Sequence, residues 1–353
     1  MPEQELCFPH SWELADTPAQ REEVYSFRYR HYFNQLPEAE WLDHDKGRVY
    51  SPHDEHCVHL VARNAEGKMI AVSTAGRADA ANLPTEWTQM LQLDRLRPLD
   101  LAKILISSRL VELPACRGTP LFLLLFKYAA RLFTAQGYGY TIHYSPPAVV
   151  ALYERLGYRS YGNGFTLASG LYRIPMILVV ADAAHLGRVR SMFSDAIRGL
   201  VPTGDVSLAY KLLPELLSPP LCAHNAPDAL ALVRGLCRNN DAEQIIPNEA
   251  ARLICRAALP HLRAGDAPVH PGDKPLLWFV LSGACEVADK TGARQIVQAG
   301  YGINAYSGCS FVVLEDADIL IFGNAEPFDG AQSIVPAERF WKELLAARKK
   351  AHR

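Results

Sequence analysis

Hydrophobic and aromatic residues near the start of the chain recur at the spacing of a helix face. Within residues 20–36 they are Val24, Phe27, Tyr32 and Phe33. Thr17 and Pro18 precede them, and these residue types favour the cap and the first turn of a helix. We therefore predict an early amphipathic helix.

Two short apolar runs follow and indicate a β-hairpin. Residues 57–63 and 69–74 are the runs, and the link between them, Asn-Ala-Glu-Gly, is a turn-forming sequence. Residues 103–113 form a third strand-like run. The polar stretch after this run ends at Gly118, so we expect a turn there.

The next stretch predicts a strand between two helices. Residues 121–133 are apolar over a length too great for one strand, which favours a helix. Residues 140–144 are strand-like, residues 147–156 have a helical pattern, and Gly157 is a stop signal. We therefore predict a mixed α/β domain over residues 1–182, with both antiparallel and parallel strands.

The pattern changes after residue 182. Residues 183–258 contain short helical segments broken by prolines, which predict a helical connector. In residues 259–330, short β-type runs lie between glycines, as in small barrels and jelly rolls. Residues 331–353 are predicted to form a helical tail. The predicted fold class is α+β, with a small all-β jelly-roll domain after the mixed sheet.

Length and charge support two domains and exclude some partners. A chain of 353 residues exceeds the usual size of a single hydrophobic core. Its formal net charge of -2 gives no electrostatic reason to bind nucleic acid. The first residues lack a basic segment followed by an apolar one, and no window approaches the roughly 20 apolar residues that span a bilayer. We therefore expect a cytoplasmic protein without a membrane span.

The cysteine and histidine pattern does not favour a metal site. The eight cysteines include no Cys-x-x-Cys pair, which argues against a zinc site and a redox dithiol. A cupin-type metal site would need two or more histidines at strand spacing, and His270 has no such partner. We expect neither a bound metal nor a permanently bound cofactor.

Residues 104–158 resemble motifs A and B of the GNAT superfamily of N-acyltransferases. In that family a strand leads through a tight turn to a helix N-terminus, whose N–H groups and dipole hold the pyrophosphate of coenzyme A. The resemblance implies a GNAT-type sheet flanked by helices, and an acyl-CoA or acyl-carrier-protein thioester as cosubstrate. The donor-binding residues that it implies are Leu113, Arg117, Gly118 and Thr119.

Two positions in the turn depart from the family pattern. The family has a polar residue where this chain has Ala115, and a small residue where it has Pro120, which lacks an N–H donor. We expect a weaker grip on coenzyme A, or an acyl-carrier-protein donor whose phosphopantetheine arm carries one phosphate. The alternative is an ordinary strand-to-helix turn that binds no ligand.

The segment LYERLGY at residues 152–158 looks like the GNAT segment in which a tyrosine protonates the departing thiolate. The resemblance gives this role to Tyr153. A phenol with a reference pKa of about 10 stays protonated at neutral pH and can donate as charge develops on sulfur. The alternative is that Tyr153 packs as an ordinary residue of a short helix.

Further residues resemble the autoinducer synthases and the N-acyl amino acid synthases. They are Tyr25, Arg28, Arg30, Asp43, Asp45, Asp54 and the run Ser108-Arg109-Leu110. In those families the arginine and acidic positions build the pocket for the amine acceptor. The substrate-binding residues that this implies are Arg28, Arg30, Asp54 and Arg109. We expect Arg109 to bind a substrate carboxylate or, alternatively, to pair with the acidic loop before the hairpin.

The base that deprotonates the acceptor amine has several candidates. Those families carry a glutamate where this chain has Ile106. The alternatives are Glu112, Asp54, His56 and His59, directly or through water, and we predict Glu112. Strand alternation would place Ser108, Leu110 and Glu112 on one face and Arg109 on the other, unless a bulge intervenes.

Residues 261–322 resemble the cyclic-nucleotide-binding β-roll in the spacing of their glycines and of the run Phe279-Val280-Leu281-Ser282-Gly283. That family binds the ribose with a glutamate and the cyclic phosphate with an arginine. This chain has Gly302-Ile303-Asn304 and then no arginine before Glu326, so we expect no cyclic-nucleotide binding. Dimerisation, completion of the substrate pocket and docking of a carrier protein are the roles left open.

The sequence therefore predicts an N-acyltransferase that moves an acyl group from a thioester to the amine of a small molecule, such as an amino acid, by direct attack. A noncatalytic regulator that binds an acyl thioester or a metabolite is the alternative. Acyl length, acceptor identity and the choice between coenzyme A and a carrier protein stay open.

Overall fold

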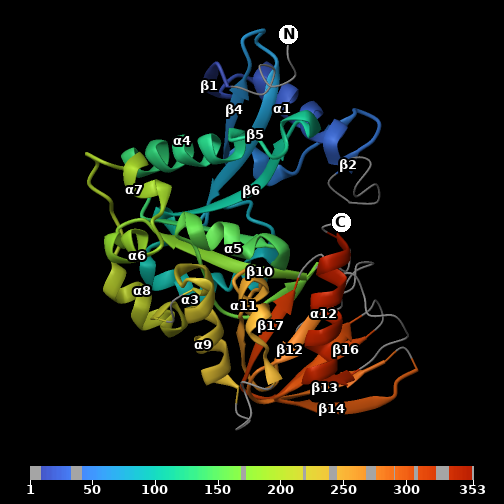
Figure 1. Cartoon of the computed structure of the whole chain (residues 1–353). Coiled ribbons are helices and arrows are strands. Elements are labelled where there is room, and N and C mark those ends of the chain that lie inside the picture. The colour runs from blue at the N-terminus through green and yellow to red at the C-terminus, as the bar shows by residue number, and fades with distance from the viewer. Residues whose placement is uncertain are drawn as a thin grey trace. The chain divides into compact units, whose positions relative to one another are not determined.

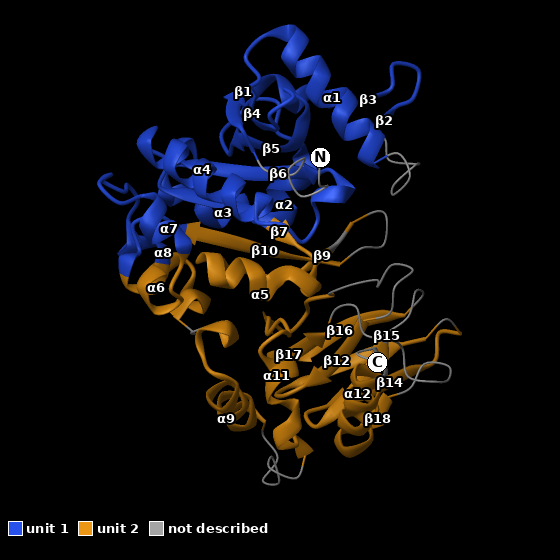
Figure 2. Ribbon diagram, turned by 45° about the horizontal axis from the view of Figure 1, so that its top comes forward, with its two compact units in different colours: residues 1–143, 179–183, 192–209 blue, residues 144–178, 184–191, 210–353 orange. Residues whose placement is uncertain are grey.

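The computed structural model of the chain (Figure 1) divides into two compact units that interleave along the sequence. Unit 1 comprises residues 1–143, 179–183 and 192–209, and unit 2 comprises residues 144–178, 184–191 and 210–353 (Figure 2). The structure describes residues 9–32, 42–167, 172–217, 220–237, 245–267, 276–289, 291–305, 309–322 and 334–351. The predicted domain boundaries stay a prediction, and the units are described separately below.

Unit 1 contains a mixed sheet with strand order β1-β4-β5-β6-β7. The strands are β1 (Ser11–Leu14), β4 (Cys57–Arg63), β5 (Met69–Arg77), β6 (Ile104–Glu112) and β7 (Tyr140–Ser145), of which the last two residues belong to unit 2. The first four are antiparallel neighbours, and β7 runs parallel to β6. The predicted mixed α/β sheet with parallel and antiparallel strands is confirmed.

Helices cover both faces of this sheet because its strands carry apolar residues on both sides. Helix α1 (Pro18–Tyr32) packs on the face of Val61 and Val72. Helix α4 (Leu121–Ala135) packs on the opposite face, with Leu60 and Ala71. The predicted cap of α1 is present, since the Thr17 hydroxyl accepts a hydrogen bond from the N–H of Gln20 at 3.2 Å.

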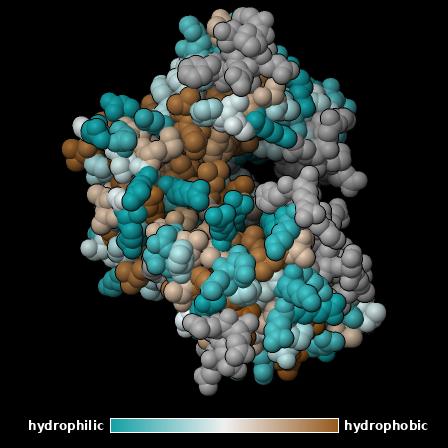
Figure 3. All heavy atoms as spheres, in the orientation of Figure 1, coloured by the Kyte–Doolittle hydropathy of each residue, from teal (hydrophilic) through white to brown (hydrophobic). Residues whose placement is uncertain are grey.

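Helix α4 directly follows Pro120 and keeps part of its apolar surface exposed. The Thr119 hydroxyl accepts a hydrogen bond from the N–H of Leu121 at 3.3 Å. Leu121 and Leu125 are buried against the sheet, whereas Leu123 and Tyr128 are each 37% exposed. Figure 3 shows hydrophobic residues at the surface in the part of unit 1 where α4 lies. No helix among the described residues is long and apolar enough to cross a membrane.

Unit 2 begins with helix α5 (Pro147–Leu156) and a small antiparallel group of strands. Gly157 ends α5 with φ of +106°, and a Cβ there would lie 2.4 Å from Leu186 Cδ2, so both its backbone and its surroundings require glycine. The strands are β8 (Arg159–Ser160), β9 (Phe165–Thr166) and β10 (Tyr172–Val179), with β8 and β9 both paired to β10.

Short helices fill the stretch predicted as a connector. They are α6 (Ala183–Arg188), α7 (Met192–Ala196), α8 (Val206–Leu212), η6 (Pro214–Leu217), η7 (Leu221–Ala223), α9 (Ala226–Leu236), η8 (Asn248–Ala250) and α11 (Ala251–Ile254). The described part of residues 183–254 contains no strand. Asn225 caps α9 by accepting a hydrogen bond from the N–H of Asp228 at 3.0 Å.

Two antiparallel sheets follow in unit 2. One has the order β11-β17-β12-β15-β18 and the other β14-β13-β16. The bounds are β11 (His261–Leu262), β12 (Leu276–Val280), β13 (Ala284–Ala288), β14 (Arg294–Gln298), β15 (Tyr301–Ala305), β16 (Ser310–Glu315), β17 (Ala317–Phe322) and β18 (Ile334–Pro336). Trp278 of β12 and Phe311 of β16 meet with ring centroids 4.4 Å apart. The likeness to a cyclic-nucleotide-binding β-roll stays a prediction.

The predicted C-terminal helix, α12 (Ala337–Ala351), packs against the larger sheet. Phe340 is fully buried, and its ring lies 5.2 Å from that of Phe279. Gly302 of β15 makes room for it, because a Cβ at this position would lie 1.9 Å from Phe340 Cδ2. The sheet face that carries Gly302 is therefore covered by the protein's own helix.

We predict that Gly302→Ala lowers the free energy of unfolding by about 1 to 3 kcal/mol, because the added methyl group overpacks the contact with Phe340. Urea unfolding followed by circular dichroism measures the change. Gly187→Ala is the matched control, since nothing lies within 4 Å of a Cβ built there. Equal stability of the Gly302→Ala variant and the wild type would contradict this packing.

Candidate functional site

Strands β6 and β7 pair over a short distance and then separate. Residues Ile104 to Ile106 of β6 pair with Tyr140 to Ile142 of β7, and no later residue of β6 pairs with β7. From Ser107 onward β6 pairs on its other side with β5 alone. Beyond Ile106 this edge of β6 has no strand partner among the described residues.

A β-bulge at Arg109 lies directly beyond this point. Val72 of β5 pairs with Val111 and Thr74 pairs with Ser108, so one residue of β5 lies opposite two residues of β6. Arg109 has φ of +49°, a left-handed conformation that is strained for a side chain other than glycine. The strand therefore bends at Arg109.

The bulge corrects the face assignment made from strand alternation. Cross-strand partners share a face, so Ser108 lies on the face of Thr74, whose hydroxyl contacts α1 through Arg28. Glu112 pairs with Ala71, which packs on the opposite face beneath α4. Ser108 and Glu112 therefore lie on opposite faces, contrary to the prediction, because the bulge shifts the alternation by one residue.

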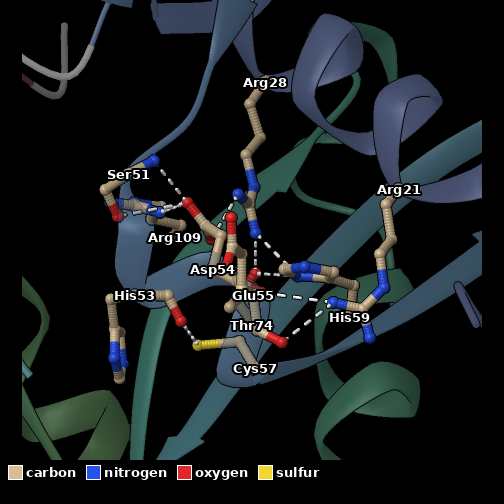
Figure 4. A network of polar contacts seen from close by, with 10 residues as sticks. All are labelled: Arg21, Arg28, Ser51, His53, Asp54, Glu55, Cys57, His59, Thr74 and Arg109. Carbon is tan, nitrogen blue, oxygen red and sulfur yellow. Dashed lines mark hydrogen bonds and ion pairs between the residues drawn. The ribbon is translucent and has the colours of Figure 1, made fainter. Parts of the chain in front are cut away.

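Three of the four predicted substrate-binding residues meet in one buried network (Figure 4). Arg28 of α1 donates to the Asp54 carboxylate at 2.9 Å, and both side chains are fully buried. Arg109 donates to the second oxygen of the same carboxylate. Asp54 lies in η2 (Pro52–His56), a 3₁₀ turn before β4. The network thus joins α1, η2 and β6.

Neutral side chains complete the network. The Ser51 hydroxyl accepts a hydrogen bond from Arg109 at 2.9 Å, and the Ser51 N–H donates to Asp54 at 2.9 Å. Arg28 also contacts the Thr74 hydroxyl and lies 3.0 Å from His59 Nδ1. Because an arginine can only donate, Nδ1 of His59 is an acceptor. Burial, followed by the charge of Arg28, lowers the pKa of His59 to about 3, so the ring is neutral.

The network carries one positive charge in excess among the described side chains. Burial alone would raise the pKa of Asp54, but Arg28 and Arg109 outweigh it and hold that pKa at about 2. Two guanidinium groups thus face one carboxylate. Arg28 Nε and His59 Nε2 are buried and have no hydrogen-bond partner among the described residues. The arrangement suits a ligand that brings an anionic or other hydrogen-bond-accepting group.

Other predicted acceptor residues lie outside this network. Arg30 is exposed and its guanidinium lies over the Phe27 ring at 6.0 Å, because residues two apart on a helix point to different sides. Asp43 accepts hydrogen bonds from the Lys46 N–H and from Arg48 Nε, both at 3.1 Å. Asp45 is exposed. Asp43 therefore stabilises the turn between β2 (Leu42–Asp43) and β3 (Arg48–Val49).

The predicted donor turn is open to solvent. Arg117 and Gly118 are exposed, and Gly118 has φ of +80° with nothing within 4 Å of the position of a Cβ. Pro120 directly precedes α4, so the donor that it lacks is one of the first orphan N–H groups of the helix. Leu113 is partly buried and donates its N–H to Ile70 at 2.9 Å. Exposed backbone next to a helix N-terminus is suited to binding an anion. The role of this turn in binding the donor phosphates stays a prediction.

The electrostatics narrow the choice of base. With a pKa of about 2, Asp54 cannot hold a proton near neutral pH, and His59 already uses Nδ1 as an acceptor. Burial raises the pKa of Glu112, against a smaller opposing effect of Arg117, and its Oε2 has no hydrogen-bond partner among the described residues. His56 lies 2.9 Å from the side-chain nitrogen of Asn82. Glu112 stays the predicted base.

Tyr153 lies on α5 in unit 2, and its ring meets that of Tyr158 edge-on at 5.6 Å. Its role as a general acid stays a prediction. Its neighbour Glu154 is buried, and Cys222 is the group whose polar interactions with the carboxyl lower its pKa most. Burial raises the pKa of Glu154 to about 7, although these interactions oppose the shift.

Sequence reasoning missed Ser51, His53 and Thr74. Ser51 and Asp54 stand three residues apart, which is the spacing of a capping box and a signal that could have been noticed. Thr74 enters the network through the pairing of β4 and β5, which brings it 3.1 Å from His59 Nδ1. His53 is buried, and neither ring nitrogen has a hydrogen-bond partner among the described residues.

The sequence was also compared with known proteins. No protein-family model and no curated protein matches it. Solved structures match about half of the chain. The CoA-dependent acyl-homoserine lactone synthase MesI is 15% identical, over 49% of this chain and 87% of its own, with a TM-score of 0.40.

Two further solved structures match similar parts. FeeM, an N-acyl amino acid synthase from uncultured soil microbes, is 14% identical over 53% of this chain and 98% of its own, with a TM-score of 0.37. The acyl-homoserine lactone synthase LasI is 11% identical over 56% of this chain and 100% of its own, with a TM-score of 0.40. The similarity is distant, so activity has to be argued from the site itself.

We predict that Glu154 makes the stability of the protein depend on pH. Its pKa is 4.5 as a free group and about 7 in the folded protein, so the folded state holds the proton more tightly. The free energy of unfolding should therefore fall by about 3 kcal/mol as the pH rises from 4.5 to 7. Glu154→Gln has nearly the same shape and removes the titration. Urea unfolding at pH 5 and pH 8 gives the free energy of unfolding of both proteins. The variant should be more stable relative to the wild type at pH 8 than at pH 5. The same difference in free energy at both pH values would contradict the raised pKa of the buried carboxyl.

Proposed function

We propose that the protein is an N-acyltransferase that moves an acyl group from a thioester to the amine of a small molecule. The observation that carries the proposal is the bulged strand β6. It separates from its parallel neighbour β7 after Ile106, presents Arg109 to a buried cationic network on one face, and leads to the open turn at Gly118. One strand thus connects a site for an acceptor to a site for a donor.

The acceptor is an amino acid or a related metabolite with a carboxylate. The excess positive charge of Arg28 and Arg109 over Asp54 supports this class, because a substrate carboxylate would balance it. The free edge of β6 supports a donor with an amide-containing arm, since such an arm can pair with strand backbone. The phosphates of the donor would lie at Arg117, Gly118 and Thr119. Coenzyme A and an acyl carrier protein both supply such an arm.

The reaction is a direct attack without a covalent acyl-enzyme. The acceptor ammonium loses a proton to a base, the amine forms a C–N bond with the thioester carbonyl carbon, and the C–S bond breaks. Tyr153 gives its phenolic proton to the leaving sulfur and regains one from the attacking nitrogen. No permanently bound cofactor takes part. The dimerisation, pocket-completion and carrier-docking roles of the C-terminal sheets stay predictions.

The direct test is a screen for thiol release. The protein is incubated with acyl-CoA thioesters of two to sixteen carbons, or with the matching acyl-carrier-protein thioesters, and a pool of the twenty amino acids. Free thiol and N-acyl product are then measured by colorimetry and mass spectrometry. Formation of an N-acyl product together with free thiol would support the proposed N-acyltransferase activity. Donor binding without turnover for every pair would contradict it and would favour a noncatalytic thioester-binding regulator.

We predict that Tyr153→Phe lowers kcat by roughly 10- to 1000-fold, because the variant cannot protonate the leaving sulfur. Donor affinity, measured by calorimetry, should change little. Tyr158→Phe is the matched control, since Tyr158 is buried on the neighbouring turn. Wild-type turnover in the Tyr153→Phe variant would remove Tyr153 from the mechanism.

We predict that Gly118→Asp reduces donor affinity at least tenfold, because a carboxylate would stand where the donor phosphate approaches. Gly118→Asn is the control, since asparagine has nearly the same shape, tolerates a positive φ and carries no charge. The difference in Kd between the two variants isolates the charge. Equal donor affinity in Gly118→Asp and Gly118→Asn would mean that the turn has no role in phosphate binding.

A further inference from the structure

His53 is a buried histidine with no hydrogen bond to either ring nitrogen among the described residues. Its side chain is 2% exposed and lies next to Asp54 in η2. Figure 4 shows its imidazole pointing away from the Asp54 carboxylate, while its backbone carbonyl accepts a hydrogen bond from the Cys57 thiol at 3.3 Å. An unpaired polar group in the interior destabilises the folded state. Such a group indicates a site that a polar ligand fills.

The place of His53 follows from a glycine of β5. A Cβ built on Gly76 would lie 2.7 Å from His53 Nε2, so the imidazole fits over the sheet because Gly76 has no side chain. Gly76 pairs with Ile106, and Ile106 with its partner Ile142 forms the last pair before β6 and β7 separate. The imidazole therefore lies over the point where the two strands separate.

His53 also lies on the same face of the sheet as the buried network. Gly76 and Thr74 are two residues apart on β5 and point to one face, and Thr74 contacts Arg28 and His59 on that face. The ring of Trp87 meets the imidazole edge-on at 5.2 Å and fixes its orientation. A ligand held by Arg28 and Arg109 would therefore lie on the same face of the sheet as a fixed imidazole without a hydrogen-bond partner among the described residues.

The other candidate bases are less well placed for such a ligand. Glu112 lies on the opposite face of the sheet, which separates it from a substrate on the α1 side. Asp54 is held as a carboxylate by two arginines. His59 already accepts a hydrogen bond from Arg28. His53 is the described histidine of this face whose two ring nitrogens are both without a partner.

We propose that His53 is the general base that removes the proton from the acceptor ammonium. This assignment rests on the proposed acyl transfer. A neutral ring nitrogen takes one proton from the ammonium, and the freed amine attacks the thioester carbonyl. The sulfur leaves with a proton from Tyr153, which recovers one from the new amide nitrogen, and His53 then releases its proton to water. The net products are the amide, the thiol and one proton.

The charges around His53 agree with this role. Burial lowers the pKa of His53, Asp54 raises it by a smaller amount, and Arg109 and His56 lower it further. The ring is therefore neutral at pH 7 and has a lone pair to accept a proton. The Cys57 thiol donates to the His53 backbone carbonyl, and burial raises the pKa of this thiol to about 12, so it stays neutral.

The test compares His53→Ala and His53→Gln with the wild type in the thiol-release assay. We expect kcat to fall by roughly 100- to 1000-fold in both variants, with the KM for the acceptor little changed. Added imidazole should restore turnover at least tenfold in His53→Ala, and substituted imidazoles of higher pKa should restore more. His10→Ala, at an exposed position, is the control and should neither lose activity nor respond to imidazole.

The outcomes separate the two proposals. A wild type without turnover contradicts the acyltransferase, and with it the base. An active wild type with full turnover in the His53 variants contradicts the base alone. If His53→Ala loses activity but imidazole restores nothing, while thermal melting shows a folded variant, the role of His53 is packing and the proposal is wrong. Should His53→Ala melt below the assay temperature, folded His53→Gln with a normal acceptor KM and wild-type kcat would overturn it equally.

Discussion

The buried carboxylate of Asp54 is the interaction on which the site depends. A single buried charge is strongly unfavourable, and Asp54 and Arg28 can both be fully buried because they pair at 2.9 Å. Removing the carboxylate would leave Arg28 buried without a counter-charge, which typically costs about 3 to 5 kcal/mol. Asp54 also holds Arg109, and so it fixes α1, η2 and the bulge of β6 relative to one another. The strain at Arg109 is thereby supported by an ion pair rather than by packing alone.

The sequence predicted most strands and helices around the N-terminal sheet, but it did not predict the bulge of β6 or the short strand β1. β4, β6, β7 and α5 were identified because each is a run of mainly apolar or aromatic residues next to turn-forming residues. The bulge could not be read from the pattern, because one extra residue reverses the faces of everything after it. β1 was missed since its four residues, Ser-Trp-Glu-Leu, are too few to show alternation, and they pair with β4 from a distant part of the chain.

The sequence also predicted only some of the residues of the candidate site. The resemblance to known families brought together Arg28, Asp54 and Arg109, and the structure joins these three. Arg30 carries the same charge but lies on another side of α1, which residue type alone does not reveal. Thr74 and His53 could not be found by residue type. Their roles come from register and from the absence of a side chain at Gly76, and both are properties of the folded chain. Ser51 could have been found from its capping-box spacing to Asp54.

Unit 2 brings together elements that lie far apart in the sequence. Asn163, in the loop between β8 and β9, donates to Asp266, which follows β11, at 2.6 Å. Tyr172 of β10 packs on Trp278 of β12 with ring centroids 5.9 Å apart. β8, β9 and most of β10 precede residue 179 in the sequence. They nevertheless belong to the same compact unit as the C-terminal sheets. Helix α5 and strand β10 pack against elements that come later in the sequence. A mutation in the C-terminal sheets can therefore change the position of α5, the helix that carries Tyr153, through direct packing inside unit 2. This effect needs no ligand bound to those sheets.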